Sequence, residues 1–479
     1  MSRVMIYMIY FTLYTIVLLF WGKSGFKKTN NIKDFCVAGN SLGLFISVST
    51  FTATLFSAVS MQSVTGSVYQ YGYSTILYSV IGWLLGGSCL IFVAFKIKQY
   101  DIVTVSDYFR IRYESRKYQA FTGVITVICY ILYIIIQIKG FGIVVSELLD
   151  INYNIAILLI YLFIVYTGFG GLFSVAKTDA LNLIMVVVGV FLVAGSVLLN
   201  LGGITAIHQE VGIITNGASL DATSNGLFSP VMILTTSLAW GLGTAANPQY
   251  IIRITSAKDK KTGVRMICVS VFVLSIIYLG LMVIGMGSRV MAPTADSVES
   301  VDEILAYIIN TKIFSYVSGV MFISIIAAAI STANSQLLLL SSSFTYDIYI
   351  NLFKKEISND KFLNINRVII FIAGTVSLLL SIHPLETLLI YGSYIWSIVA
   401  VTFLCPLYGG LYWKKATRQG AISSSVGGIV AVVIFYFVTH NGILNTDIHP
   451  VLPSILISMI IFYIVSIKTY KSQDDRNEI

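Results

Sequence analysis

The chain alternates long apolar runs with short polar segments along its whole length. Each run is near the roughly 20 residues that a helix needs to cross a bilayer, and thirteen can be marked. They lie near residues 4–22, 42–68, 73–95, 119–148, 154–169, 179–200, 228–247, 264–289, 313–347, 366–383, 387–412, 420–439 and 450–467. The pattern predicts an all-α polytopic membrane protein with thirteen transmembrane helices, forming a single transmembrane domain over residues 1–479.

Composition supports a membrane protein and excludes a soluble domain. Of 479 residues, 57% are hydrophobic and only 11% are charged, and the mean hydropathy is +0.86. A soluble domain carries about 25% charged residues. The first apolar run lacks a small-residue cleavage site, so we expect a retained helix and not a signal peptide. The five cysteines are scattered, with neither metal-binding nor disulfide spacing.

The net charge of +8 is explained by where the basic residues lie. Most of the 30 lysines and arginines fall in one set of predicted loops, which includes Lys27, Arg112, Arg253 and Lys414. Because cytoplasmic loops are enriched in basic residues, this set is predicted to be cytoplasmic. With thirteen spans in a plasma membrane, the N-terminus is then outside and residues 469–479 form a short cytoplasmic tail.

Two predicted spans are poor continuous helices. Residues 47–66 read SVSTFTATLFSAVSMQSVTG, with a Ser, Thr, Gln or Gly at almost every second position. The span at 228–247 ends near Gly241, Gly243 and Pro248, which disfavour a helix. Small residues also serve helix packing, which is the simpler interpretation of the first segment. Two interrupted spans five apart are typical of an inverted-repeat secondary transporter, whose site lies at broken helices.

One helix face within residues 327–336, AAAISTANSQ, is unusually rich in oxygen atoms. Ser331 and Thr332 follow Ala328 by three and four residues and can share its face. Two hydroxyls and nearby carbonyls form the oxygen-only environment that a hard cation such as Na⁺ prefers. Helix packing through small polar residues is the alternative.

Two charged residues fall at or inside predicted spans. Asp179 begins the sixth span and needs a cation, unless it only caps the helix at the membrane boundary. Lys139 lies well inside the fourth span, where it would pair with an anionic substrate group or with a structural carboxylate. No nucleophile–base set, metal cluster or phosphate-binding loop is present, so we expect neither an enzyme nor an ATP-driven pump.

Four stretches, taken in order, resemble the sodium:solute symporter family over nearly the whole chain. They are GGLFSVAKTD (170–179), GLGTAANPQYIIRITSAKD (241–259), AAAISTANSQLL (327–338) and PLYGGLYWKKATRQGA (406–421). Within the family, FTATLFSAVSMQSVTGSVYQYG (51–72), STANSQLLLLSSSFTYDIYIN (331–351) and HPVLPSILIS (449–458) are most similar to pantothenate symporters, followed by the proline branch.

The resemblance implies a leucine-transporter-like inverted repeat of five plus five helices. The repeat would cover about residues 42–412, with one helix before it and two after it. It also implies a sodium site made of the Ala53 and Phe56 carbonyls with the face of Ala328, Ser331 and Thr332. Some family members bind a second sodium near the residue that matches Asp179, so a second site is possible here.

The resemblance further implies a Na⁺-coupled symporter that imports a small organic anion or zwitterion. Pantothenate is the first expectation, with proline, sialic acid or another monocarboxylate as alternatives, and a transporter-like membrane sensor as a different class. Leu55 departs from the polar residue of the proline branch, and Lys139 matches nothing in the pantothenate pattern. Ser57, Gln62 and Lys139 are the predicted substrate contacts.

Overall fold

The computed structural model describes residues 2–294, 298, 300–353, 357–382 and 388–470. Across these residues the regular structure is helical, with a single isolated backbone bridge between Leu42 and Ala257. The elements are α1 (Arg3–Phe26), α2 (Ile32–Val37), η1 (Ala38–Asn40), α3 (Leu44–Leu55), η2 (Val59–Ser63), α4 (Val64–Tyr71), α5 (Tyr73–Thr75), η3 (Ile76–Val80), α6 (Ile81–Lys96), η4 (Ile97–Gln99), α7 (Val105–Tyr113), α8 (Arg116–Leu149), α9 (Tyr153–Gly168), α10 (Gly171–Leu201), α11 (Ile204–Ile214), η5 (Ala218–Leu220), α12 (Pro230–Ala246), α13 (Pro248–Ser256), α14 (Lys260–Met291), η6 (Val301–Glu303), α15 (Ile304–Thr311), α16 (Ser318–Ser342), η7 (Ser343–Ile350), α17 (Asn351–Phe353), α18 (Asn359–Leu380), α19 (Leu388–Tyr412), α20 (Arg418–His440) and α21 (Val451–Thr469).

The number of membrane-spanning helices differs from the predicted thirteen. Ten of the described helical segments are long and apolar enough to cross a membrane, and the bent pair α3 with η2–α4 makes up to eleven. Two other predicted spans fall on α9, an apolar helix of 16 residues, and on α12, a helix of 17 residues that is followed by α13. The count of thirteen and the five-plus-five repeat therefore stay predictions.

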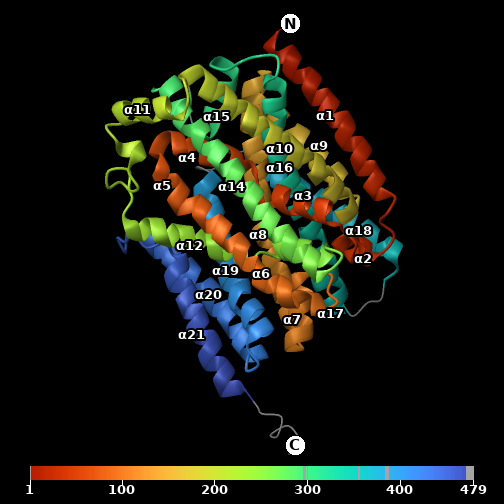
Figure 1. Ribbon diagram of the computed structural model, residues 1–479. Coiled ribbons are helices and arrows are strands. Elements are labelled where there is room, and N and C mark those ends of the chain that lie inside the picture. Colours follow the sequence, from red (N-terminus) through yellow and green to blue (C-terminus); the bar gives the residue numbers. More distant parts are fainter. Residues whose placement is uncertain (1, 295–297, 299, 354–356, 383–387, 471–479) are drawn as a thin grey trace, which may run out of the picture.

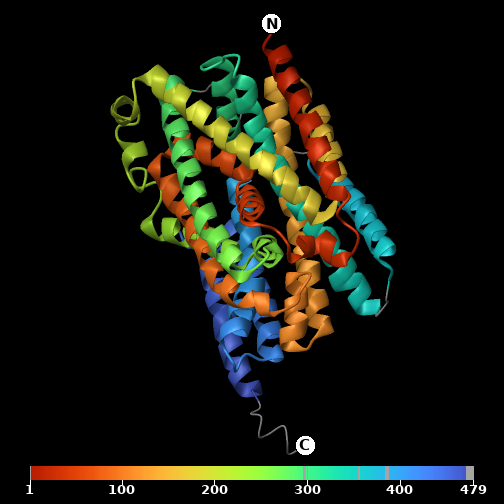
Figure 2. The ribbon, with the colours of Figure 1, turned by 45° about the vertical axis from the view of Figure 1, so that its right-hand side comes forward.

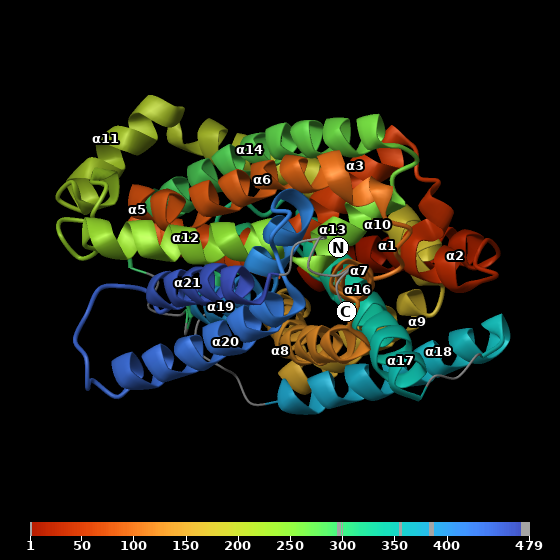
Figure 3. The ribbon, with the colours of Figure 1, turned by 90° about the horizontal axis from the view of Figure 1, so that it is seen from below.

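The long helices form one bundle around α16 (Figure 1). The most apolar window of the α16–α17 segment is completely buried, whereas that of α1, at the edge of the bundle, is 28% buried. Helices α19, α20 and α21 pack together on one side, as the view from below shows (Figure 3). Figures 1 and 2 place the start of α1 and the end of α21 at opposite ends, which an odd number of spans requires. The predicted tail beyond residue 470 lies outside the described residues.

The first predicted broken helix is confirmed. Helix α3 ends at Leu55, Phe56 is extended (φ −97°, ψ 110°), and the chain resumes as η2–α4 at an angle of 62°. Ser and Thr side chains compete for backbone hydrogen bonds, which weakens this stretch as a continuous helix. The break leaves carbonyl groups at the end of α3 without partners from the next helical turn.

The second break lies at Pro248, the last of the three residues predicted to interrupt this span. Helix α12 runs without interruption through Gly241 and Gly243 to Ala246 and breaks at Asn247, which is extended (φ −73°, ψ 124°). Pro248 disfavours a helical conformation for the residue before it and then begins α13. The glycines serve packing instead, because a Cβ atom on Gly241 would lie 3.0 Å from the Gly82 carbonyl oxygen and one on Gly243 would lie 2.6 Å from the Trp396 Cβ atom.

Candidate functional site

The oxygen-rich face of α16 lies directly against the break after α3. The Ser331 hydroxyl donates to the Ala53 carbonyl oxygen at 2.9 Å and contacts the Ala328 carbonyl oxygen at 3.1 Å. The Thr332 hydroxyl lies 3.4 Å from the Phe56 carbonyl oxygen. The structure therefore brings together all five residues expected to form the sodium site.

The chemistry of this cluster suits Na⁺. Both hydroxyl-bearing residues are only 1% exposed, and the carbonyl groups that face them come from a helix end inside the bundle. A hydroxyl that now donates to a carbonyl oxygen can rotate and present its lone pairs to a cation. Three carbonyl oxygens and two hydroxyl oxygens would then surround a hard ion without a charged ligand.

A second polar cluster surrounds Asp179 on α10. Asp179 is fully buried and accepts a hydrogen bond of 2.6 Å from the Thr50 hydroxyl on α3. The Arg253 guanidinium lies 4.0 Å from the same carboxylate oxygen, and its Nε lies 3.4 Å from the Thr50 hydroxyl. Asp179 is therefore the acceptor in a buried ion-pair network, and the interpretation as a simple helix cap is wrong.

Arg253 is the residue that the sequence analysis misplaced. It was expected in a basic loop, but it is fully buried on α13 and donates to the Ser335 hydroxyl at 2.6 Å. A carboxylate inside a span needs a cation, and Arg253 lies only five residues after the helix-breaking Pro248. Together, these two facts could have predicted that Arg253 is buried and faces Asp179.

The two clusters are neighbours. Ser335 follows Ser331 by one helical turn on α16, and its hydroxyl lies 3.0 Å from the Thr54 hydroxyl. Thr54 lies between Ala53 and Phe56, the sources of the sodium-site carbonyls. A chain of polar contacts thus leads from Asp179 through Arg253 to the oxygen cluster. Occupation of a second sodium site beside Asp179 stays a prediction.

The predicted substrate contacts Ser57 and Gln62 lie in the segment that resumes after the break. Ser57 precedes η2, and its hydroxyl accepts from the Ser60 backbone N–H at 3.4 Å. Gln62 donates to the Gly140 carbonyl on α8 at 2.9 Å, whereas its Oε1 has no partner among the described residues. Both side chains are buried at the centre of the bundle.

Lys139 precedes Gly140 on α8 and is only 5% exposed. The Asp302 carboxylate, in the short helix η6, interacts with it electrostatically. Burial raises the pKa of Asp302, and the positive charge of Lys139 opposes that shift. An acidic partner therefore comes from a segment remote in the sequence, and a role for Lys139 in substrate binding stays a prediction.

Further polar groups near the two breaks were not anticipated. On α8, Gln137 accepts from the Ala58 backbone N–H at 3.1 Å, and the Tyr130 hydroxyl donates to Asn247 at 2.8 Å. The donor atoms Gln137 Nε2, Asn247 Nδ2 and Gln249 Nε2 are buried and lack acceptors within the described parts of the chain. Unsatisfied N–H donors beside broken helices could donate hydrogen bonds to a carboxylate group of a substrate.

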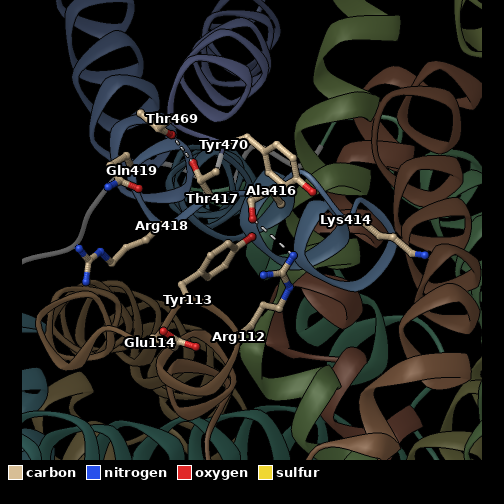
Figure 4. Close-up of a pocket in the computed structure, with 10 residues that line it drawn as sticks. All are labelled: Arg112, Tyr113, Glu114, Lys414, Ala416, Thr417, Arg418, Gln419, Thr469 and Tyr470. Atoms are coloured by element: carbon tan, nitrogen blue, oxygen red, sulfur yellow. Dashed lines mark hydrogen bonds between the residues drawn. The ribbon is translucent and has the colours of Figure 1, made fainter. Parts of the chain in front are cut away.

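Two cavities lie elsewhere in the bundle. One, of about 260 Å³, opens between α4, α12 and α19 and is lined by residues that include Trp240 and His449. The other, of about 410 Å³, lies where α7, the α19–α20 connection and the end of α21 meet. Figure 4 shows Lys414 and Arg418 at opposite sides of it, pointing apart. Neither cavity is lined by the oxygen cluster.

The family model of the sodium:solute symporter family matches residues 35–428. The chain belongs to this family. It is therefore a Na⁺-coupled solute symporter with Na⁺ as its coupling ion, and its relatives are transporters, in agreement with the expectation that it is not an enzyme.

Two curated relatives cover nearly the full chain. The osmoregulated proline transporter OpuE of Bacillus subtilis (strain 168) is 27% identical over 470 residues, covering 95% of this chain and 94% of the relative. The sodium/proline symporter of Staphylococcus aureus (strain USA300 / TCH1516) is 26% identical over 478 residues, with 96% and 92% covered. These relatives give no support to the expectation that pantothenate is the substrate.

Solved structures show the same fold. A substrate-bound, outward-open Na⁺-coupled sialic acid symporter matches with a TM-score of 0.82 and 20% identity, covering 98% of both chains. Mhp1, a nucleobase-cation-symport-1 family transporter in a closed conformation, matches with a TM-score of 0.60 and 11% identity, covering 94% of this chain and 98% of Mhp1. The all-helical transporter fold is thereby confirmed.

The oxygen cluster predicts a loss of sodium affinity when its hydroxyls are removed. In Ser331→Ala and Thr332→Ala, one ligand oxygen is lost while helix propensity is kept. We expect each change to weaken Na⁺ binding by about 1–3 kcal/mol, or roughly 5- to 150-fold, measured as the Na⁺ concentration for half-maximal uptake. Ser324→Ala is the matched control, because this buried α16 hydroxyl donates within its own helix, to Met321. An unchanged Na⁺ dependence in both variants would assign the hydroxyls to packing.

The ion pair between Asp179 and Arg253 predicts that the effects of their substitutions on stability are not additive. Removing one partner leaves a buried charge unpaired, so Asp179→Asn and Arg253→Gln should each destabilise the fold by about 3–5 kcal/mol. The double variant should be more stable than the sum of the two losses predicts, as measured by thermal unfolding in detergent. Strictly additive losses would show that the two side chains do not interact.

Proposed function

We propose that this protein imports a small zwitterionic or anionic solute together with Na⁺ bound by Ala53, Phe56, Ala328, Ser331 and Thr332. The observation that carries the proposal is the contact between the α16 hydroxyls and the carbonyl groups at the α3 break. An ion there would link α16 to the broken helix. Binding at this point biases which arrangement of the two segments is stable, which is how a gradient can drive transport.

The proposed membrane arrangement has thirteen spans, with a five-plus-five inverted repeat over about residues 42–412. The two broken segments, α3 with η2–α4 and α12 with α13, would be the first helix of each repeat. The basic loops would face the cytoplasm, with the N-terminus outside. The opposite positions of the chain ends in Figure 1 agree with an odd number of spans.

The proposed substrate is an amino acid of the proline type. Proline is the solute named for both curated relatives. The unsatisfied donors of Gln137, Asn247 and Gln249 suit a carboxylate. Nearby, Tyr133 stacks on Trp396 with ring centroids 4.4 Å apart, which provides an apolar wall for a small ring. Pantothenate, sialic acid and other monocarboxylates are the competing substrates for the test.

Uptake into proteoliposomes tests this function. With an inward Na⁺ gradient, labelled proline should accumulate, and collapse of the gradient should abolish accumulation. Unlabelled proline should compete at lower concentration than pantothenate or sialic acid. Accumulation driven by a proton gradient in the absence of Na⁺ would contradict the proposal. If pantothenate alone competed, the proposed substrate would change to pantothenate, and the proposed Na⁺ coupling would stand.

Lys139→Met tests the predicted role of this lysine. If its ammonium group binds the substrate carboxylate, the variant should raise the half-saturation constant for the solute several-fold, while Lys139→Arg should rescue only partly because its planar fork differs from a compact ammonium group. The double variant Lys139→Met with Asp302→Asn distinguishes substrate binding by Lys139 from a structural pair with Asp302. Recovery of wild-type uptake in the double variant would assign Lys139 to a structural pair with Asp302.

A further inference from the structure

A buried carboxylate outside the ion site lies at the end of the bundle that carries α7 and α17 (Figure 1). Asp347, on η7, is fully buried. Its Oδ1 atom accepts from the Thr104 hydroxyl at 2.6 Å and from Gln119 Nε2 at 2.9 Å. The Ser343 hydroxyl, one turn earlier, also faces it. These direct partners are all neutral.

Arg110 is the only positively charged group shown near Asp347 among the described residues, and it is already paired with Asp107. Arg110 donates to Asp107 through Nε at 2.9 Å and Nη2 at 2.7 Å, and its charge also reaches Asp347. Cys36 and Tyr346 are the other titratable groups near Asp347. One arginine therefore faces two buried carboxylates. If both were ionised, the cluster would carry an uncompensated negative charge away from water, which is costly.

Two buried acceptor atoms in this cluster lack, within the part of the chain that the structure describes, a partner that a proton could supply. Asp347 Oδ2 and Gln119 Oε1 are buried acceptors without a hydrogen-bond partner among the described residues. They belong to two groups that are already joined through Gln119 Nε2 and Asp347 Oδ1. A hydrogen on Asp347 Oδ2 would donate to Gln119 Oε1 and satisfy both atoms at once. No other single change within this pair does so.

We propose that Asp347 is a proton-binding site, protonated in this conformation and held as a carboxylic acid–amide pair by Gln119. Water that reaches the carboxyl group when α7 and η7 separate would stabilise its ionised form. The opened state then binds fewer protons than the sealed state, so rising pH favours opening and falling pH favours the sealed state. The pairing itself does not depend on which solute is carried.

Infrared spectroscopy of the purified full-length chain tests the protonation directly. At neutral pH, the wild-type-minus-Asp347→Asn difference spectrum should contain a carboxylic-acid C=O band. Asp101→Asn is the control, because this exposed carboxylate is paired with Lys33 and should contribute no such band. In Gln119→Leu the band should shift, because its hydrogen-bond partner is lost. Absence of the band from the Asp347→Asn difference spectrum overturns the proposal.

Transport supplies a second readout. With equal pH on both sides and a fixed Na⁺ gradient, wild-type turnover should rise several-fold as the pH is raised, and Asp347→Asn should lose most of this rise. Should Asp347→Asn fail to fold, the Gln119→Leu band shift still decides the pairing. A band that disappears when Na⁺ is added to the wild-type protein would show a cation site in place of a proton site and would overturn the proposal.

Discussion

The structure depends on one constraint, which is that backbone polar groups inside a membrane bundle need partners from the protein or from a bound ion. The break at Phe56 frees backbone carbonyl groups in the buried interior of the bundle, away from solvent. Ser331 and Thr332 on α16 supply the partners. Because a hydroxyl can donate to a carbonyl or present its lone pairs to a cation, the same atoms could serve the break with and without Na⁺. The broken helix and the proposed ion site are thus one structural feature.

Buried charge extends the same constraint across the bundle. Asp179 on α10 is satisfied by Thr50 on α3 and faces Arg253 on α13, which in turn binds Ser335 on α16. Four helices are joined at one point, and two of them belong to the broken segments. A change in one broken segment therefore changes the partners available to the other, which is a physical route between ion binding and helix movement.

The sequence predicted those features that depend on local spacing. The helical interval between Ala328 and Ser331 predicted the oxygen cluster that faces the α3 break, because residues three apart share a face wherever the helix packs. Arg253 was missed because charge was used to assign loops, and only the tertiary structure shows that α13 turns this arginine inward. The second break lies at Pro248 as expected, but Gly241 was interpreted as a further helix breaker, whereas it lies in a continuous helix and serves close packing against α6.

Three buried carboxylates show how local environment decides what a charge can do. Asp107 accepts two direct hydrogen bonds from Arg110, which favour its ionised form. Asp179 reaches its arginine through the Thr50 hydroxyl, at a separation that leaves its second oxygen without a partner. Asp347 has an amide as its partner and an arginine that another carboxylate already occupies. Burial alone does not distinguish the three, whereas incomplete pairing marks Asp179 and Asp347 as the candidates for exchange of an ion or a proton.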